Sequence, residues 1–149
     1  NNTVVNPDGS YYCVFINRAR RQQGDPDNMT LKNNILYHHS TATNRGSICM
    51  HTSGMDTLVS DYNVVMEYFG IDDNKSQDTF AEWQDRGFDT NSIQATAAQL
   101  FTDASNDDYT LAANSPAIDA GTTVTGVSDD ILGVSRPQGN AYDIGCYED

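Results

Sequence analysis

The residues best suited to chemistry are three histidines and a cluster of arginines. His38 and His39 follow the apolar run at 33–37 (NNILY), and His51 follows the run at 46–50 (GSICM). Acid–base chemistry on an acidic substrate needs a base, often Lys, Arg, His or Tyr, and a cation that neutralises the substrate's carboxylate. The histidines could supply the base if neighbouring strands bring them together, and the cation could come from Arg18, Arg20 and Arg21.

A plainer interpretation competes with this one. Histidines at strand ends are commonly solvated, and a basic cluster that runs into a turn, here QQGDPD, is commonly an exposed loop. We therefore expect no catalytic residues, and we keep these histidines and arginines as the candidates for acid–base chemistry.

Two acidic turns could bind calcium, because carboxylate and amide oxygens are its usual protein ligands. Neither turn has the twelve-residue spacing of an EF-hand or matches the glycine-rich calcium nonapeptide, and acidic turns that bind nothing are common. We expect no cofactor, with calcium as the one ion that the turns could hold. The candidate ligands are Asp72, Asp73, Asp103, Asp107 and Asp108.

Other catalytic and cofactor motifs are missing from the sequence. It has no GxSxG nucleophile motif, no phosphate-binding loop, no dinucleotide fingerprint, and no CxxC or HxxxH spacing for zinc. The three cysteines allow either one disulfide and one free thiol or three thiols; they are Cys13, Cys49 and Cys146.

The charge of the chain favours a location outside the cell. The net charge is −13, with five Lys/Arg against three acids in residues 1–50 and three against eighteen in residues 51–149. Such an acidic chain binds nucleic acid and anionic lipid poorly, and no hydrophobic run is long enough to span a bilayer. We expect a secreted or cell-surface protein without nucleic-acid partners and without membrane insertion.

A weak repeat predicts the elements that would position these residues. The runs NNTVV, NNILY and YNVVM align at spacings of 32 and 29 residues, and each places an asparagine (Asn2, Asn34 or Asn63) before three largely apolar or β-branched residues. Such short runs between turn residues are typical of strands, and strands repeating at this period predict a parallel β-solenoid. We expect the asparagines to stack as a hydrogen-bonded ladder; the alternative is three turn residues at chance spacing.

A second alignment places two of the cysteines in corresponding strands. The runs YYCVFI (11–16) and GSICMH (46–51) match within a residue or two, so Cys13 and Cys49 would be neighbours. We expect either a disulfide or stacked, buried thiols.

Residues 67–100 interrupt the strands with a short helix. Thr79 and Glu82 have the spacing of a capping box, and Phe80 and Trp83 lie on one face. Trp83 is expected to be a packing anchor, with a sugar-stacking platform as the alternative. The chain then returns to a strand at 100–101, and the Gly- and Pro-rich stretch 108–148 is expected to cover the end of the solenoid.

These motifs carry a resemblance to a known group. The stretch DYTLAANSPAIDAG (108–121), followed by DILGVSRPQGNAYDIGCYE (130–148), resembles the C-terminal end of secreted bacterial right-handed parallel β-helix proteins of the pectate-lyase-like superfamily. The runs LKNNILY and SDYNVV are similar to that group too, and Cys146 departs from it because alanine is usual there. The resemblance implies the architecture but no single activity, since the group includes lyases, hydrolases, epimerases and adhesins.

The sequence therefore predicts one all-β domain, a right-handed parallel β-helix of few coils with one helical excursion and a C-terminal cap. Residues 1–66 would form the coils, 67–100 the excursion, and 101–149 the last strands and the cap. A chain that begins within a strand is expected to be a fragment or a processed part of a longer one.

The expected function is an extracellular scaffold or carbohydrate-interaction module with a polysaccharide partner. Free strand edges on the first coil would allow assembly end to end, as a homo-oligomer or filament. The alternative is the C-terminal part of a polysaccharide lyase or related carbohydrate-active enzyme. Glycosylation sequons of N-x-S/T form begin at Asn1, Asn28 and Asn74.

Overall fold

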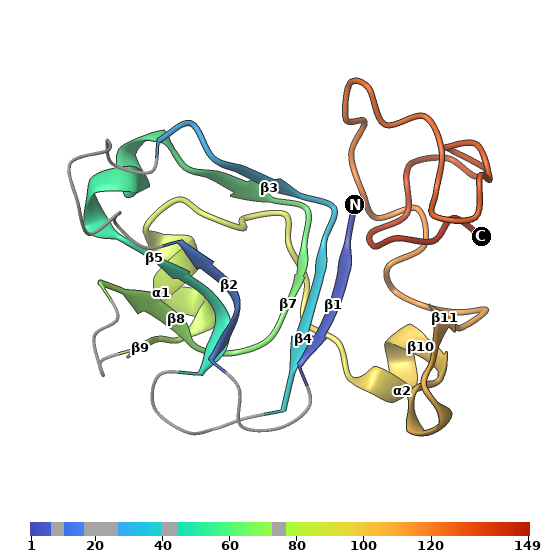
Figure 1. The fold of residues 1–149 in the computed structure, drawn as a ribbon, viewed down its shortest axis with the longest axis horizontal. Coiled ribbons are helices and arrows are strands. Elements are labelled where there is room, and N and C mark those ends of the chain that lie inside the picture. Colours follow the sequence, from blue (N-terminus) through green and yellow to red (C-terminus); the bar gives the residue numbers. More distant parts are fainter. Residues whose placement is uncertain (7–10, 17–26, 40–44, 73–76) are drawn as a thin grey trace.

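The computed structural model describes residues 1–6, 11–16, 27–39, 45–72 and 77–149 (Figure 1). Parallel strands β1 (Thr3–Asn6), β4 (Ile35–His38) and β7 (Val64–Val65) form one sheet in the order β1-β4-β7. A second sheet has the order β2-β5-β8-β9 and a third pairs β3 with β6 in parallel; their strands are β2 (Tyr12–Ile16), β5 (Gly46–Met50), β8 (Phe69–Ile71), β9 (Gln77–Asp78), β3 (Thr30–Lys32) and β6 (Val59–Asp61).

The remaining elements are short. Strands β10 (Phe101–Asp103) and β11 (Asp108–Leu111) form an antiparallel pair. The helices are η1 (Thr52–Thr57) and η2 (Ala104–Asn106), which are 3-10 helices, and the α-helices α1 (Phe80–Asp85) and α2 (Ala97–Leu100).

The predicted right-handed parallel β-helix is wrong. In the described parts of the chain, the strands form four small, separate sheets of two to four strands, and both β8-β9 and β10-β11 are antiparallel. The physical reason lies in the reach of the repeat, which covers only residues 1–66. Beyond it Asp, Gly and Pro residues are frequent and favour turns over strands, and no strand follows β11 in residues 112–149.

The sheet β1-β4-β7 is buried on both faces. On one face, Leu36 and Val65 join a cluster that includes Ile48, Phe69 and Trp83. On the other face, the buried side chains form a second cluster, which consists of Ile35, Tyr37, Val64, Ala95, Leu100, Phe101, Leu111, Ala117 and Ile144. A parallel sheet covered on both sides needs apolar residues at successive positions, and ILY at 35–37 supplies them.

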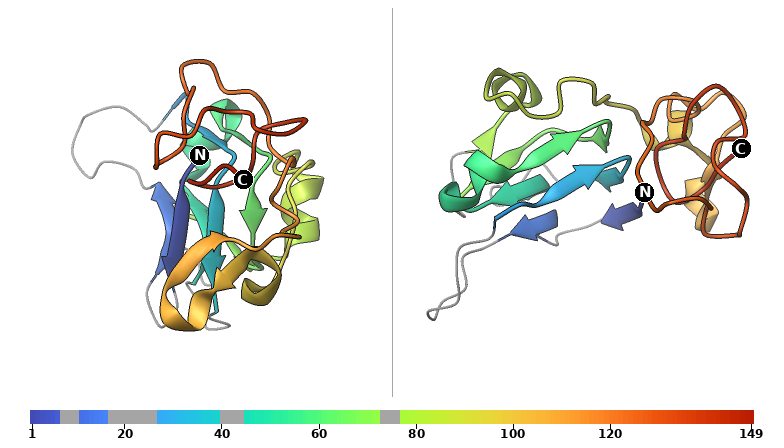
Figure 2. Two further views of the ribbon diagram at one scale, coloured as in Figure 1. Left: turned by 90° about the vertical axis from the view of Figure 1, so that its right-hand side faces the viewer. Right: turned by 90° about the horizontal axis from the view of Figure 1, so that it is seen from above.

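Residues 112–149, which we call the closing stretch, lie beside the sheets and do not cap their end. Figures 1 and 2 show residues 112–149 against the outer face of β1-β4-β7. Ile144 donates its amide to the Ala117 carbonyl at 2.9 Å, and Gly145 donates to the Asn33 carbonyl at 2.9 Å. The expected C-terminal cap is therefore corrected to a lateral cover, whose apolar residues complete the second face of the sheet.

Helix α1 lies where the sequence predicted a helix. Thr79 caps it, with hydrogen bonds in both directions between Thr79 and Glu82. The Trp83 side chain is fully buried and stacks on Phe69, with 4.9 Å between ring centroids. Trp83 is thus a packing anchor and offers no sugar-stacking surface.

The lateral cover predicts unequal effects for two apolar truncations. Ile144→Ala removes a fully buried side chain and should lower the free energy of unfolding by about 2–5 kcal/mol. The control Leu132→Ala changes a residue that is 73% exposed and should stay within about 0.5 kcal/mol. Urea denaturation measures both; equal, small effects would contradict the packing of this stretch on the sheet.

Candidate interaction surface

The asparagines predicted to form a ladder lie in one hydrogen-bonded row across the start of β1, β4 and β7. The Oδ1 atom of Asn34 accepts from both the backbone amide and the side-chain Nδ2 of Asn2, each at 3.1 Å. The Oδ1 atom of Asn63 accepts the same two bonds from Asn34, at 2.9 and 3.0 Å. The row therefore has a direction, because each asparagine donates to the next one along the chain.

The row ends on a buried carboxylate that the sequence did not reveal as important. Asp89 is fully buried, and its Oδ1 atom accepts from Asn63 Nδ2 at 2.8 Å and from Ser92 Oγ at 2.6 Å. Its Oδ2 atom accepts from Ser60 Oγ at 2.7 Å and from Trp83 Nε1 at 2.8 Å. Four donors satisfy the carboxylate, so its role is structural. The only sequence signal was the Asp-x-x-Ser spacing after the helix.

Asn33 is a second residue that the sequence analysis missed. It takes a positive φ of 55°, and its side chain bonds both backbone groups of Thr122: Nδ2 donates to the carbonyl at 2.6 Å, and Oδ1 accepts from the amide at 2.9 Å. Asn33 therefore ties the closing stretch to the start of β4. Asparagine suits this position because it tolerates the left-handed region better than most residues.

The three histidines do not come together. His38 is buried at the end of β4, with Nε2 2.8 Å from the Glu67 carbonyl oxygen, and the exposed His39 packs its ring edge-on against Tyr37. His51 follows β5 on a different sheet, with Nδ1 2.8 Å from Ser53 Oγ. These three contacts are with different residues, Glu67, Tyr37 and Ser53. The candidates Arg18, Arg20 and Arg21 lie outside the described residues.

His51 and Asp72 form a polar pair. The Nε2 atom of His51 lies 3.5 Å from Oδ1 of Asp72, whose carboxylate also accepts the backbone amide and the hydroxyl of Thr52. The hydrogen bond from the Thr52 hydroxyl is the largest cause that lowers the pKa of Asp72, so this carboxylate is ionised at neutral pH. The calcium candidate Asp73 lies outside the described residues.

The second acidic turn bonds to itself. Asp103 accepts from Ser105 Oγ at 2.6 Å and from Asn106 Nδ2 at 2.7 Å, and these bonds lower the pKa of its carboxyl. Asp107 accepts from the Tyr109 hydroxyl, and Asp108 accepts from the amide and hydroxyl of Thr110. Within the described parts of the chain, no group of three or more His, Cys, Asp or Glu could hold a metal ion. Calcium binding stays a prediction.

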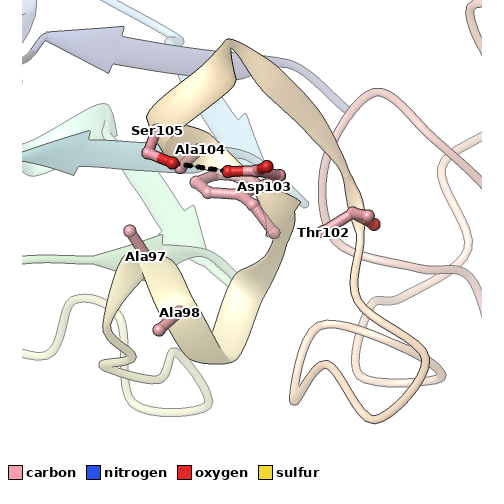
Figure 3. A pocket seen from close by; sticks show the side chains of 7 residues that line it. Ala97, Ala98, Thr102, Asp103, Ala104 and Ser105 are labelled. Carbon is pink, nitrogen blue, oxygen red and sulfur yellow. Dashed lines mark hydrogen bonds between the residues drawn. The ribbon is translucent and has the colours of Figure 1, made fainter.

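A hollow of about 340 Å³ lies beside this turn, between α2 and β10 (Figure 3). Figure 3 shows small side chains around it, with the Asp103 carboxylate bonded to Ser105, and Phe101 lines it as well. A binding pocket of this size ordinarily presents convergent polar groups, whereas the one carboxylate here is already used. The hollow supports no ligand assignment.

None of the three cysteines, all of which lie among the described residues, forms a disulfide. Cys49 pairs with Phe15 in the ladder between β2 and β5, so Cys13 and Cys49 are not opposite each other, and neither forms a disulfide. Cys49 is buried, and partial burial raises the pKa of the Cys13 thiol to about 12. Of the two alternatives, the disulfide is therefore excluded. Cys146 is a free thiol as well.

The glycosylation candidates differ in exposure. Asn28 is exposed and has a positive φ of 54°, whereas Asn1 is partly buried. Asn74 lies outside the described residues. Glycosylation of any of them stays a prediction.

A buried ion pair holds the closing stretch together. The Arg136 and Glu148 side chains are 1% and 0% exposed, and Arg136 Nη1 lies 2.8 Å from Glu148 Oε2. Arg136 also donates to the carbonyls of Asp143, Gly145 and Tyr147. The motif residues RP, DIG and YE thus meet in one buried cluster of hydrogen bonds. The role of this cluster is structural, because its donors point inward.

Each of the three sheets built from β1 to β9 has an edge strand at each end of the molecule, and the two ends differ. At the far end, the Ile93 segment bonds to the edge of β7, β9 covers β8, and Asp89 donates its amide to the Ser60 carbonyl on β6. At the near end, no described segment pairs with the outer edge of β1 or β2. The right-hand view of Figure 2 shows these two blue strands at one end and α1 at the other.

Large apolar side chains are exposed at the near end. Tyr11, just before β2, is 39% exposed, and Phe15, within β2, is 38% exposed. Met29, just before β3, is 36% exposed. Unpaired strand edges beside exposed apolar groups are the mark of an interaction surface. We call the outer edges of β1 and β2, with these three side chains, the open end.

Comparison with protein-family models, with curated proteins and with solved structures found no match. The resemblance to the pectate-lyase-like superfamily stays a prediction without support from them. Among the described residues, no helix is long and apolar enough to cross a membrane.

The ion pair predicts a large loss of stability on truncation. Arg136→Met leaves Glu148 buried without a counter-charge and should lower the free energy of unfolding by about 3–5 kcal/mol. The control Arg86→Met breaks a surface pair with Asp78, in which Arg86 is 44% exposed, and should cost at most about 1 kcal/mol. Chemical denaturation at pH 7 measures both, and similar losses would contradict a structural role specific to Arg136.

Proposed function

We propose that this chain is a structural module of the cell surface or the extracellular space, which acts by associating with a second copy of itself. The observation that carries the proposal is the difference between the two ends of the sheets. No segment among the described residues pairs with the outer edges of β1 and β2 at the open end, while the corresponding edges of β7 and β8 are already paired.

The covered far end limits the assembly to two copies. A filament would need the open end of one copy to meet a free edge at the far end of the next. Because Ile93, β9 and Asp89 occupy those edges, two open ends must meet each other. The proposed assembly is thus a closed two-fold dimer, which is one form of the expected homo-oligomer and differs from the filament given as its alternative.

The charge distribution is compatible with such a contact. Strands β1 and β2 belong to residues 1–50, which carry five Lys/Arg against three acids, whereas the later residues carry most of the negative charge. Copies that meet through the least acidic part of a −13 chain avoid the strongest repulsion. An extracellular polysaccharide remains a predicted further partner.

Light scattering on a dilution series tests this function. We expect twice the mass of one chain at high concentration, and a shift to the monomer on dilution. Phe15→Lys places a charge on the open end and should weaken the dimer at least about tenfold, because burying an unpaired ammonium group is costly. The control Val59→Lys alters β6, where Val59 is 47% exposed, and should leave the dimer intact. A monomer at every concentration would refute the proposal.

A polysaccharide lyase is the second candidate, and it depends on one observation. The contact between His51 Nε2 and Asp72 resembles a base with an orienting carboxylate. If His51 is the base, unsaturated product should raise the absorbance at 235 nm on a uronate polymer, and His51→Ala should abolish the rise while His39→Ala should not. A flat signal on every polymer, with and without calcium, would remove the lyase.

A further inference from the structure

The outer edge of β1, which pairs with no described segment and which we call its free edge, has a defined set of donors and acceptors. Ile35 on β4 donates its amide to the Asn2 carbonyl at 2.8 Å, so the peptide groups of Asn2 face β4. Because successive residues of a strand turn to opposite edges, those of Val4 face β4 too. The amides and carbonyls of Thr3 and Val5 therefore point to the free edge.

The sequence of β1 and the residue before it is nearly symmetric about Val4. Residues 2–6 read Asn-Thr-Val-Val-Asn, with an asparagine at each end, β-branched residues at 3 and 5, and Val4 in the middle. An antiparallel pair of two such strands, centred on Val4, places like beside like. Asn2 then lies opposite Asn6 of the second copy, and Thr3 lies opposite Val5.

The hydrogen-bond pattern of the free edge fits this register. In an antiparallel ladder, residues that exchange two backbone bonds alternate with residues that exchange none. The outward-facing Thr3 and Val5 would form the bonded pairs, and Val4 would meet Val4 of the second copy as a non-bonded pair. All the outward peptide groups of residues 3–5 would be satisfied.

The side chains fit the same register. Val4 packs against the apolar cluster that contains Leu36 and Trp83. A contact between Val4 and Val4 of the second copy would therefore join this cluster in one copy to the same cluster in the other. Asn2 is exposed and donates along its row, and its Oδ1 atom accepts no hydrogen bond from the described residues. The amide of Asn6 from the second copy could donate to it, since side chains of non-bonded pairs lie close together.

We infer that the dimer of the proposed function is built by antiparallel pairing of β1 with β1 of the second copy, centred on Val4. This inference depends on the proposed function, because it specifies the contact that the dimer uses. The result is one continuous sheet of six strands, in which each copy contributes β7, β4 and β1. The row of asparagines then continues from each copy into the other through the Asn2 and Asn6 pairs.

Cysteine crosslinking tests the register. In a Cys13→Ser, Cys146→Ser background, Val4→Cys should crosslink with itself, because Cα atoms of a non-bonded pair lie about 4.5 Å apart, within disulfide range. The matched variant Val5→Cys lies on the same strand, but the two added thiols would be diagonal neighbours about 7–8 Å apart, beyond that range. Oxidised glutathione supplies the oxidant and is reduced to two thiols for each disulfide formed.

Two measurements distinguish the proposed β1 register from the proposed dimer itself. Disulfide-linked dimer on a non-reducing gel should form at least about tenfold faster for Val4→Cys than for Val5→Cys, since disulfides tolerate little extra separation. The background protein without an added cysteine should form none. Light scattering of each variant under reducing conditions reports whether the dimer exists. A dimer with equal crosslinking at both positions would overturn the register alone, and absence of the dimer would overturn the proposed function as well.

Discussion

The structure depends on a small parallel sheet that is covered on both faces. β1-β4-β7 gives one face to the cluster around Trp83 and the other to the closing stretch, so the apolar side chains of β4 are almost completely removed from water. Such burial leaves the polar groups at the start of the strands without solvent, and each one needs a partner within the protein. The row of asparagines and the Asp89 carboxylate provide those partners, and Asn33 connects the same place to the closing stretch.

The abundance of Asp and Asn has a structural explanation in these contacts. Asp103 and Asp119 accept hydrogen bonds that hold turns closed, and those bonds lower the pKa of both carboxyls below the usual range. Their contribution to stability is therefore present above the pKa of the unfolded chain and is lost as the pH falls through the folded pKa. The pKa shift of Asp143 has the opposite sign, because burial raises its pKa. Its contribution to stability is therefore lost as the pH rises through the folded pKa. The carboxylates of these turns hold the turns closed through their own hydrogen bonds, without the help of a bound ion.

Local signals in the sequence were more reliable than its repeat. The capping residues of α1 and the apolar run of β4 depend on neighbours in the chain, and both lie where the sequence placed them. The spacing of the asparagines also identified residues that bond one another. The β-helix was wrong because a repeat in residues 1–66 does not determine how later turns and antiparallel pairs end the sheets. The separation of His38 from His51 and the role of Asp89 depend on contacts between distant segments, which no spacing in the sequence encodes.

Hydrogen exchange at single amides is the most direct test of this account, in which β4 is the centre and β1 is the edge that associates. The Ile35 and Tyr37 amides on β4 should exchange only on global unfolding, so they should be strongly protected even in dilute protein. The Thr3 and Val5 amides should exchange rapidly in dilute protein and slow as the concentration rises and the edge becomes paired. Equal and strong protection of all four amides in dilute protein would contradict the account, because β1 would then have no free edge.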